Sequence, residues 1–326
     1  MKGKSEPATT LLRPILDTYM DSAVALVGCT ARGLDRYSCE YDVLVVTKDK
    51  LPPTSLRFGD VYADLIFVSE NDVLKPGKPE QSISVALAKP VRDTTLVLST
   101  GIAANLAVLS ESARKASAAR LGSALKILGR AEEAIAKKSI LDADFWLLAG
   151  SYEFAYAWLL SKEVLPSPSH LLSQLRRVSR GASRWFEGFS MGAGLEAAGR
   201  AGCGARLEGV TVLHDLIRER PETGSGAATW PVARTETLSA KADELVTRIE
   251  LAECYSYMGQ ELIDAILALL RPVSKRSIGA LASGKDALLG ERLIRQLGLA
   301  RNEKAIRTGL DSLKEQVSHL ARRSQP

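Results

Sequence analysis

Hydrophobic and polar positions divide the chain into two parts of different character. In the first hundred residues, short apolar runs are separated by glycine and proline, which indicates mixed α and β structure. Two runs, Asp42–Thr47 and Val61–Val68, are apolar on both alternating faces and therefore predict buried strands. Around them the pattern predicts helices at Leu11–Met20 and Gln81–Ala88, strands at Ala25–Val27 and Thr94–Leu98, and a loop at Pro52–Gly59.

From Asn105 onward, strand signals nearly vanish and apolar residues recur every three or four positions, which is typical of helices. Helices are expected at Asn105–Lys138, Leu141–Lys162, His170–Trp185, 236–270, 286–297 and 301–323, with glycine-containing loops at 188–209 and 221–231. The predicted fold class is α+β: a small mixed-sheet domain over 1–103 followed by an all-α domain over 104–326. A division of the second domain near 221–231 is left open.

Composition narrows the class of protein without naming a function. The chain has 326 residues, 46% hydrophobic and 25% charged, with a net charge of +5, so widespread disorder is not expected. This mild positive charge is compatible with a phosphate-bearing substrate but does not imply one. The four cysteines form no CxxC pair and the three histidines lie far apart, so no zinc spacing is present. Free thiols and the absence of a signal peptide or a membrane-length apolar run predict a cytoplasmic protein with no membrane partner.

Three carboxylates are the strongest candidates for chemistry. Glu40 and Asp42 are two positions apart at the start of a predicted strand, so their side chains project from the same face. Asp64 lies in the middle of the next buried strand, where a carboxylate is costly unless a cation or a hydrogen-bond donor compensates it. If the two strands are neighbours, the three carboxylates converge and can hold divalent cations that bridge triphosphate oxygens.

This set predicts metal-assisted phosphoryl transfer, with Asp64 as an extra ligand or a base. Gly28 would let the backbone approach a phosphate, and Arg32 would neutralise phosphate charge. Simpler interpretations remain open: Glu40 and Asp42 as solvated strand-entry residues, Gly28 as a turn glycine and Arg32 as an exposed loop charge. Asp64 is harder to explain without a partner.

Residues 28–42 resemble a known signature. Gly28-Cys29 is followed by ten residues that include Ala31-Arg32-Gly33, and then by Glu40-x-Asp42. This arrangement is similar to the Gly-Ser, ten residues, Asp-x-Asp signature of the DNA polymerase β-type nucleotidyltransferase superfamily, in particular its minimal archaeal and bacterial members. The resemblance covers roughly residues 10–100. Two positions depart from it, because Cys29 stands for the serine and Glu40 for the first aspartate.

The resemblance implies a site and its ligands. Glu40, Asp42 and Asp64 would be the catalytic residues and the ligands of Mg²⁺ or Mn²⁺. Gly28, Cys29 and Arg32 would bind a nucleoside triphosphate, with ATP as the expected one. A cysteine is a poorer hydrogen-bond partner than serine, and a glutamate is one methylene longer than aspartate. The resemblance therefore implies the fold more strongly than it implies turnover.

The helical part carries weaker candidates. The segment Asp142–Arg177 resembles the HEPN-type or substrate-binding helical domains that accompany minimal nucleotidyltransferases. The spacing of four to six residues from Arg to His that marks the ribonuclease version is absent, so a ribonuclease is not expected. Arg177, Arg180 and Arg184 share one face of a predicted helix. That face is either solvated or a phosphate-binding stripe for a nucleic-acid or nucleotide acceptor.

Two functions from different classes follow. The first is a metal-dependent nucleotidyltransferase that moves a nucleoside monophosphate from a nucleoside triphosphate to a hydroxyl of an unknown acceptor, which could be RNA, a protein or a small molecule. The second is a catalytically degenerate nucleotidyltransferase fold that acts as a nucleotide-sensing, RNA-binding or protein-interaction module. The oligomeric state is left open, with a homodimer as one option.

Overall fold

The chain forms two compact units. The computed structural model describes residues 12–34, 39–49, 51–58, 61–179, 184–219, 232–270, 277–282 and 289–323. The first unit comprises Met1–Ala116 and Pro231–Ala240, and the second comprises Ser117–Trp230 and Lys241–Pro326. The first contains a mixed sheet with helices and the second is helical, which confirms the predicted α+β class with a helical domain after it.

The sheet of the first unit has five strands among the described residues, in the order β3-β4-β2-β1-β5. The central pair, β2 and β4, is parallel, and all the other neighbouring pairs are antiparallel. Parallel strands are ordinarily covered on both faces, which agrees with the apolar character of β2 and β4 on both sides. The strands are β1 (Val24–Leu26), β2 (Tyr41–Val46), β3 (Thr54–Phe58), β4 (Val61–Val68) and β5 (Lys89–Arg92).

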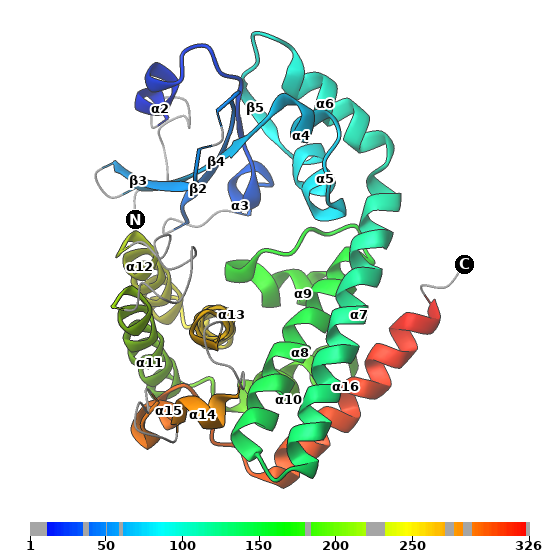
Figure 1. Cartoon of the computed structure of the whole chain (residues 1–326), viewed down its shortest axis with the longest axis vertical. Coiled ribbons are helices and arrows are strands. Elements are labelled where there is room, and N and C mark those ends of the chain that lie inside the picture. The colour runs from blue at the N-terminus through cyan, green and yellow to red at the C-terminus, as the bar shows by residue number, and fades with distance from the viewer. Residues whose placement is uncertain are drawn as a thin grey trace. The chain divides into compact units, whose positions relative to one another are not determined.

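Helices cover both faces of this sheet, as Figure 1 shows. On one face Val73, Val85 and Leu98 pack against Ala25 and Leu44. A second apolar cluster on the other face includes residues of α2 together with β2 and β4 residues. The helices of this unit are α2 (Arg13–Thr18), α3 (Gly28–Ala31), α4 (Glu70–Leu74), α5 (Pro79–Ala86) and α6 (Val97–Ala107), followed by the start of α7 (Leu109–Ala136).

Two elements of the first unit differ from the sequence prediction. The strand expected at Thr94–Leu98 is wrong, because α6 begins at Val97 and β5 lies earlier. Asp93 accepts hydrogen bonds from the backbone N–H of Leu98 (3.1 Å) and Ser99 (2.7 Å), which satisfies N–H groups at the start of the helix. The loop expected at Pro52–Gly59 is also partly wrong, because β3 occupies its second half.

The second unit is built around α8, which is buried around nearly its whole circumference. A helix that is apolar on all sides belongs in a core, and α8 packs against α10, α13 and α16. No helix among the described residues is long and apolar enough to cross a membrane. The elements are the rest of α7, α8 (Ile140–Leu160), η1 (Pro168–His170), α9 (Leu171–Ser179), α10 (Arg184–Ala193), η2 (Leu195–Ala197), α11 (Arg200–Arg218), the second part of α12 (Val232–Thr247), α13 (Leu251–Leu270), α14 (Ile278–Ala282), α15 (Glu291–Gln296) and α16 (Glu303–Arg323). The first part of α12 belongs to the first unit.

Three helical predictions are corrected by these boundaries. The helix expected at 236–270 is two helices, because Ile249 adopts a left-handed conformation (φ 61°) between α12 and α13. The single helix expected at His170–Trp185 is divided into α9 and α10. The loop expected at 188–209 is largely helical. Several of its glycines lie at close contacts instead: a Cβ at Gly209 would lie 2.9 Å from a methyl carbon of Leu297.

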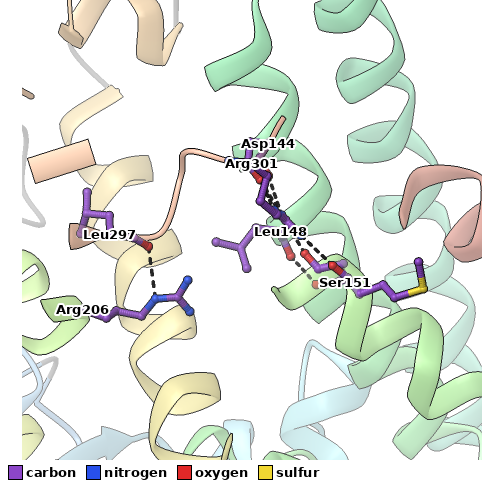
Figure 2. A network of polar contacts seen from close by, with 8 residues as sticks. Asp144, Leu148, Ser151, Arg206, Leu297 and Arg301 are labelled. Atoms are coloured by element: carbon purple, nitrogen blue, oxygen red, sulfur yellow. Dashed lines mark hydrogen bonds and ion pairs between the residues drawn. The ribbon is translucent and has the colours of Figure 1, made fainter. Parts of the chain in front are cut away.

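A buried polar network joins helices of the second unit, as Figure 2 shows. The Asp144 carboxylate is 1% exposed and lies 2.5 Å from the guanidinium of Arg301. Arg301 also donates to the backbone carbonyls of Met191 and Gly192, which satisfies further N–H groups. A buried ion pair with this many supporting hydrogen bonds resists separation, since removing either partner leaves an uncompensated charge.

Candidate metal and nucleotide site

The register of the central strands brings the predicted carboxylates together. β2 and β4 are parallel neighbours, and Asp42 lies directly opposite Asp64 in their ladder. Glu40 precedes Asp42 by two residues at the start of β2. Carboxylate oxygens from all three residues lie within 4.8 Å of one another, and all three side chains are half-buried. The convergence that the sequence made conditional on neighbouring strands is therefore present.

Gly28 is required for the position of Asp42. Its φ of +66° is a left-handed conformation that residues with a side chain adopt at a cost. A Cβ atom at this position would lie 1.9 Å from Oδ2 of Asp42, so the carboxylate occupies the space that a side chain would need. The sequence analysis assigned this glycine to the approach of a phosphate. The structure shows that residue 28 must also lack a side chain so that the Asp42 carboxylate fits beside it.

Ser55 fixes one oxygen of Asp64. It lies opposite Asp64 in the antiparallel β3–β4 ladder, and its Oγ donates a hydrogen bond of 2.6 Å to Oδ1 of Asp64. Ser55 was not among the predicted site residues, because the sequence pattern indicated a loop at this position. The alternating polar and apolar residues of Thr54–Phe58, just before the strand at Val61–Val68, are the signal that could have identified it.

Cys29 and Cys39 both precede Glu40 in the sequence, and they meet in space. Both are buried, and their sulfur atoms lie within 4.8 Å of each other. The hydrogen bond with Cys39, together with burial, raises the pKa of the Cys29 thiol well above its ordinary value. Cys29 is therefore a neutral thiol, which adds no negative charge where a phosphate is expected. The hydroxyl of its neighbour Thr30 donates to the backbone carbonyl of Glu40 at 3.4 Å.

Arg32 follows the short helix α3 and folds back on it. Its Nε donates to the carbonyl of Gly28 at 2.8 Å, so the guanidinium is held close to the glycine turn. Burial lowers the pKa of Arg32, and the Asp42 carboxylate opposes that shift. The Arg32 guanidinium is therefore close enough to Asp42 for their charges to interact, and its contact with a phosphate stays a prediction.

The donor set is suited to a hard divalent cation. Three carboxylates in one cluster repel one another, and a cation bound between them removes that repulsion. Mg²⁺ and Mn²⁺ prefer oxygen ligands, and magnesium sites commonly use one or two carboxylates and leave positions for phosphate oxygens. Glu40, Asp42 and Asp64 fit this requirement by donor type and by the spacing of their oxygens.

A second group of polar residues lies beyond the carboxylates on the β3 side and was also missed by the sequence analysis. Tyr62 is two residues before Asp64 on β4, so both side chains lie on the same face. Its hydroxyl donates to Glu236 at 2.5 Å, and the same carboxylate oxygen lies 3.4 Å from Nη1 of Arg57. Glu236 comes from the first part of α12, about 170 residues later in the chain, and no local pattern indicates this contact.

The structure does not bring the predicted arginine stripe together on one described helix. Arg177 is exposed on α9, which ends at Ser179, whereas Arg184 is the first residue of α10. Arg180 lies outside the described residues. The phosphate-binding role of these three arginines therefore stays a prediction.

No family model and no curated protein matches the sequence. Among solved structures, the chain is similar to a nucleotidyltransferase-like protein from Exiguobacterium sibiricum 255-15. The likeness covers 97% of this chain and 92% of that one, with a TM-score of 0.34 and 12% sequence identity. A likeness at this level assigns neither fold nor activity, so the interpretation of the site rests on its own residues.

Proposed function

We propose that the first unit is a metal-dependent nucleotidyltransferase of the DNA polymerase β type. The observation that carries the proposal is the convergence of Glu40, Asp42 and Asp64 on in-register parallel strands, with Gly28 making room for Asp42. The reaction transfers a nucleoside monophosphate from a triphosphate, with ATP as the expected donor, to a hydroxyl of an acceptor. The acceptor is RNA, a protein or a small molecule.

Each residue has a separate part in this proposal. Glu40, Asp42 and Asp64 hold Mg²⁺ or Mn²⁺ through carboxylate oxygens. When bound, the metal offsets the charge that develops on the phosphates and leaving pyrophosphate. Arg32 lies beside the turn at Gly28 and interacts with the triphosphate as a second positive charge. Asp64 is the carboxylate on β4, and it accepts the proton of the attacking acceptor hydroxyl or orients that hydroxyl.

Calorimetric titration with ATP in the presence of Mg²⁺ tests the binding part of this proposal. We expect the wild-type chain to bind and Asp42→Ala to lose most of the affinity, because the cluster loses the carboxylate opposite Asp64. Asp49→Ala is the matched control, since Asp49 is an exposed carboxylate just after the same strand. Equal ATP binding by the wild type and Asp42→Ala, or binding by neither, would contradict the proposed site.

A second candidate function is nucleotide binding without transfer. It is favoured by the burial of Cys29 against Cys39, which places a neutral thiol where the resembled signature has a serine hydroxyl. This candidate predicts ATP binding without release of pyrophosphate for any acceptor offered. The family-restoring changes Cys29→Ser and Glu40→Asp would then leave pyrophosphate release absent, whereas release that begins or rises with them favours the enzyme.

A further inference from the structure

We propose that Ser55 is a positioning residue for Asp64: its hydrogen bond to one carboxylate oxygen fixes the orientation in which Asp64 meets the cation. This inference rests on the proposed metal site. The geometry that carries it is the hydrogen bond of 2.6 Å from Ser55 Oγ to Asp64 Oδ1, made between directly opposed residues of the β3–β4 ladder.

The hydrogen bond works against a specific force. Asp42 lies opposite Asp64 on the other neighbouring strand, and Glu40 is close by, so Asp64 faces two other carboxylates. Repulsion between these groups favours rotation of the Asp64 carboxylate, whose terminal torsion has only weak intrinsic preferences. A charge-assisted hydrogen bond to Oδ1 opposes that rotation, and the O–H···O distance is within the range of strong bonds of this kind.

Ser55 is itself held in place by the backbone. β3 pairs with β4 over five residue pairs, from Thr54–Leu65 to Phe58–Val61, so the Ser55 Cα is fixed relative to Asp64. The side chain of Ser55 is half-buried. Groups that orient metal ligands in this way typically contribute 10- to 100-fold to metal affinity. A residue on a strand suits this role better than a residue on a loop, because the backbone of a strand holds its side chains more precisely.

The test is Mn²⁺ binding to the full chain, measured by electron paramagnetic resonance, which reports the free ion and the symmetry of the bound one. We expect Ser55→Ala to weaken binding by about 10-fold and to change the spectrum of the bound ion. Ser55→Thr keeps the hydroxyl on a residue suited to a strand, and it should restore both affinity and spectrum.

The matched control is Ser99→Ala. Ser99 donates a hydrogen bond of the same length, 2.6 Å, to Asp93 at the start of α6. This change removes the same chemical group from the same kind of serine–aspartate pair but leaves the carboxylate cluster intact. We expect it to leave Mn²⁺ affinity unchanged.

A double-mutant cycle separates positioning from direct action. If Ser55 acts through Asp64, then Ser55→Ala causes no further loss of Mn²⁺ affinity in an Asp64→Ala background. An equal loss in both backgrounds overturns the inference, and so does unchanged binding in the single variant. A wild-type chain that binds no Mn²⁺ removes the proposed function and the inference together, whereas normal binding by both the wild type and Ser55→Ala removes the inference alone.

Discussion

At the scale of single residues, the carboxylate cluster depends on the absence of a side chain at Gly28. Oδ2 of Asp42 occupies the position that a side chain of residue 28 would take. The chain offers a natural comparison in Gly33, which has the same φ of +66° but no atom within 4 Å of its Cβ position. The two glycines therefore share a backbone requirement and differ in the contact with Asp42.

This comparison gives a prediction for two substitutions. Gly33→Ala and Gly28→Ala should each lower the free energy of unfolding by roughly 1–2 kcal/mol, because an L-residue is placed in the left-handed region. Gly28→Ala alone should also weaken Mn²⁺ binding, since its new methyl group displaces the Asp42 carboxylate. Urea unfolding and Mn²⁺ titration measure the two effects separately. Equal Mn²⁺ affinities for the two variants would contradict the role of the contact.

At the scale of elements, α6 shows how a polar residue outside a helix determines where the helix starts. Burial works to raise the pKa of Asp93, but hydrogen bonds from the hydroxyl and N–H of Ser99 and from the N–H of Leu98 outweigh it. The net effect is a lowered pKa. A lowered pKa in the folded state stabilises the fold above the pKa of the unfolded chain, and this stabilisation is lost as pH falls through the folded value.

We therefore expect the contribution of Asp93 to the free energy of unfolding to depend on pH. At pH 7, Asp93→Ala should lower the free energy of unfolding by about 1 kcal/mol, the usual size of a capping loss. The difference from the wild type should begin to shrink at about pH 4, where the unfolded chain takes up the proton, and should vanish as pH falls through the lowered folded pKa of Asp93. Asp93→Asn is the control, because it keeps an acceptor oxygen that does not titrate in this range. Urea unfolding at pH 7 and pH 3 makes the measurement, and a constant difference for Asp93→Ala across this range would contradict it.

At the scale of the whole molecule, the two compact units are chemically distinguishable. The carboxylate cluster belongs to the first unit, whose segments 1–116 and 231–240 contain no tryptophan. Every tryptophan of the chain falls in the range of the second unit. Tryptophan fluorescence therefore follows the unfolding of the second unit, while far-ultraviolet circular dichroism and calorimetry follow both.

Binding at the cluster should stabilise the unit that contains it. With ATP and Mg²⁺ at about 100 times the dissociation constant, linkage adds about 2.7 kcal/mol to the stability of the first unit. We expect the calorimetric transition that lacks a tryptophan signal to move to a higher temperature, and this shift to disappear in Asp42→Ala. A ligand-induced shift that appears only in the tryptophan signal would place the binding in the second unit and contradict this assignment.

Some features of this structure can be predicted from the hydrophobic pattern within short segments of the sequence. The strands β2 and β4, the change to a helical domain and the conditional convergence of the carboxylates all follow from alternation and helical periodicity in short windows, although β4 is only partly buried and leaves Ile66 exposed. These features depend on which face of a segment is apolar, and each segment carries that information itself. The apolar alternation of Val61–Val68 even gives the limits of β4.

Other features depend on contacts between distant segments. The role of Ser55 follows from its place opposite Asp64, and the Glu236 contact joins α12 to β4 across more than 170 residues. The glycines of α10 and α11 resemble loop residues until neighbouring helices are seen to pack against them. By itself, the sequence determined which residues carry charge, which faces are buried and which carboxylates could meet. Only the tertiary structure decided which strands are neighbours and which side chains orient the carboxylates, because register and packing arise between segments that no local window contains.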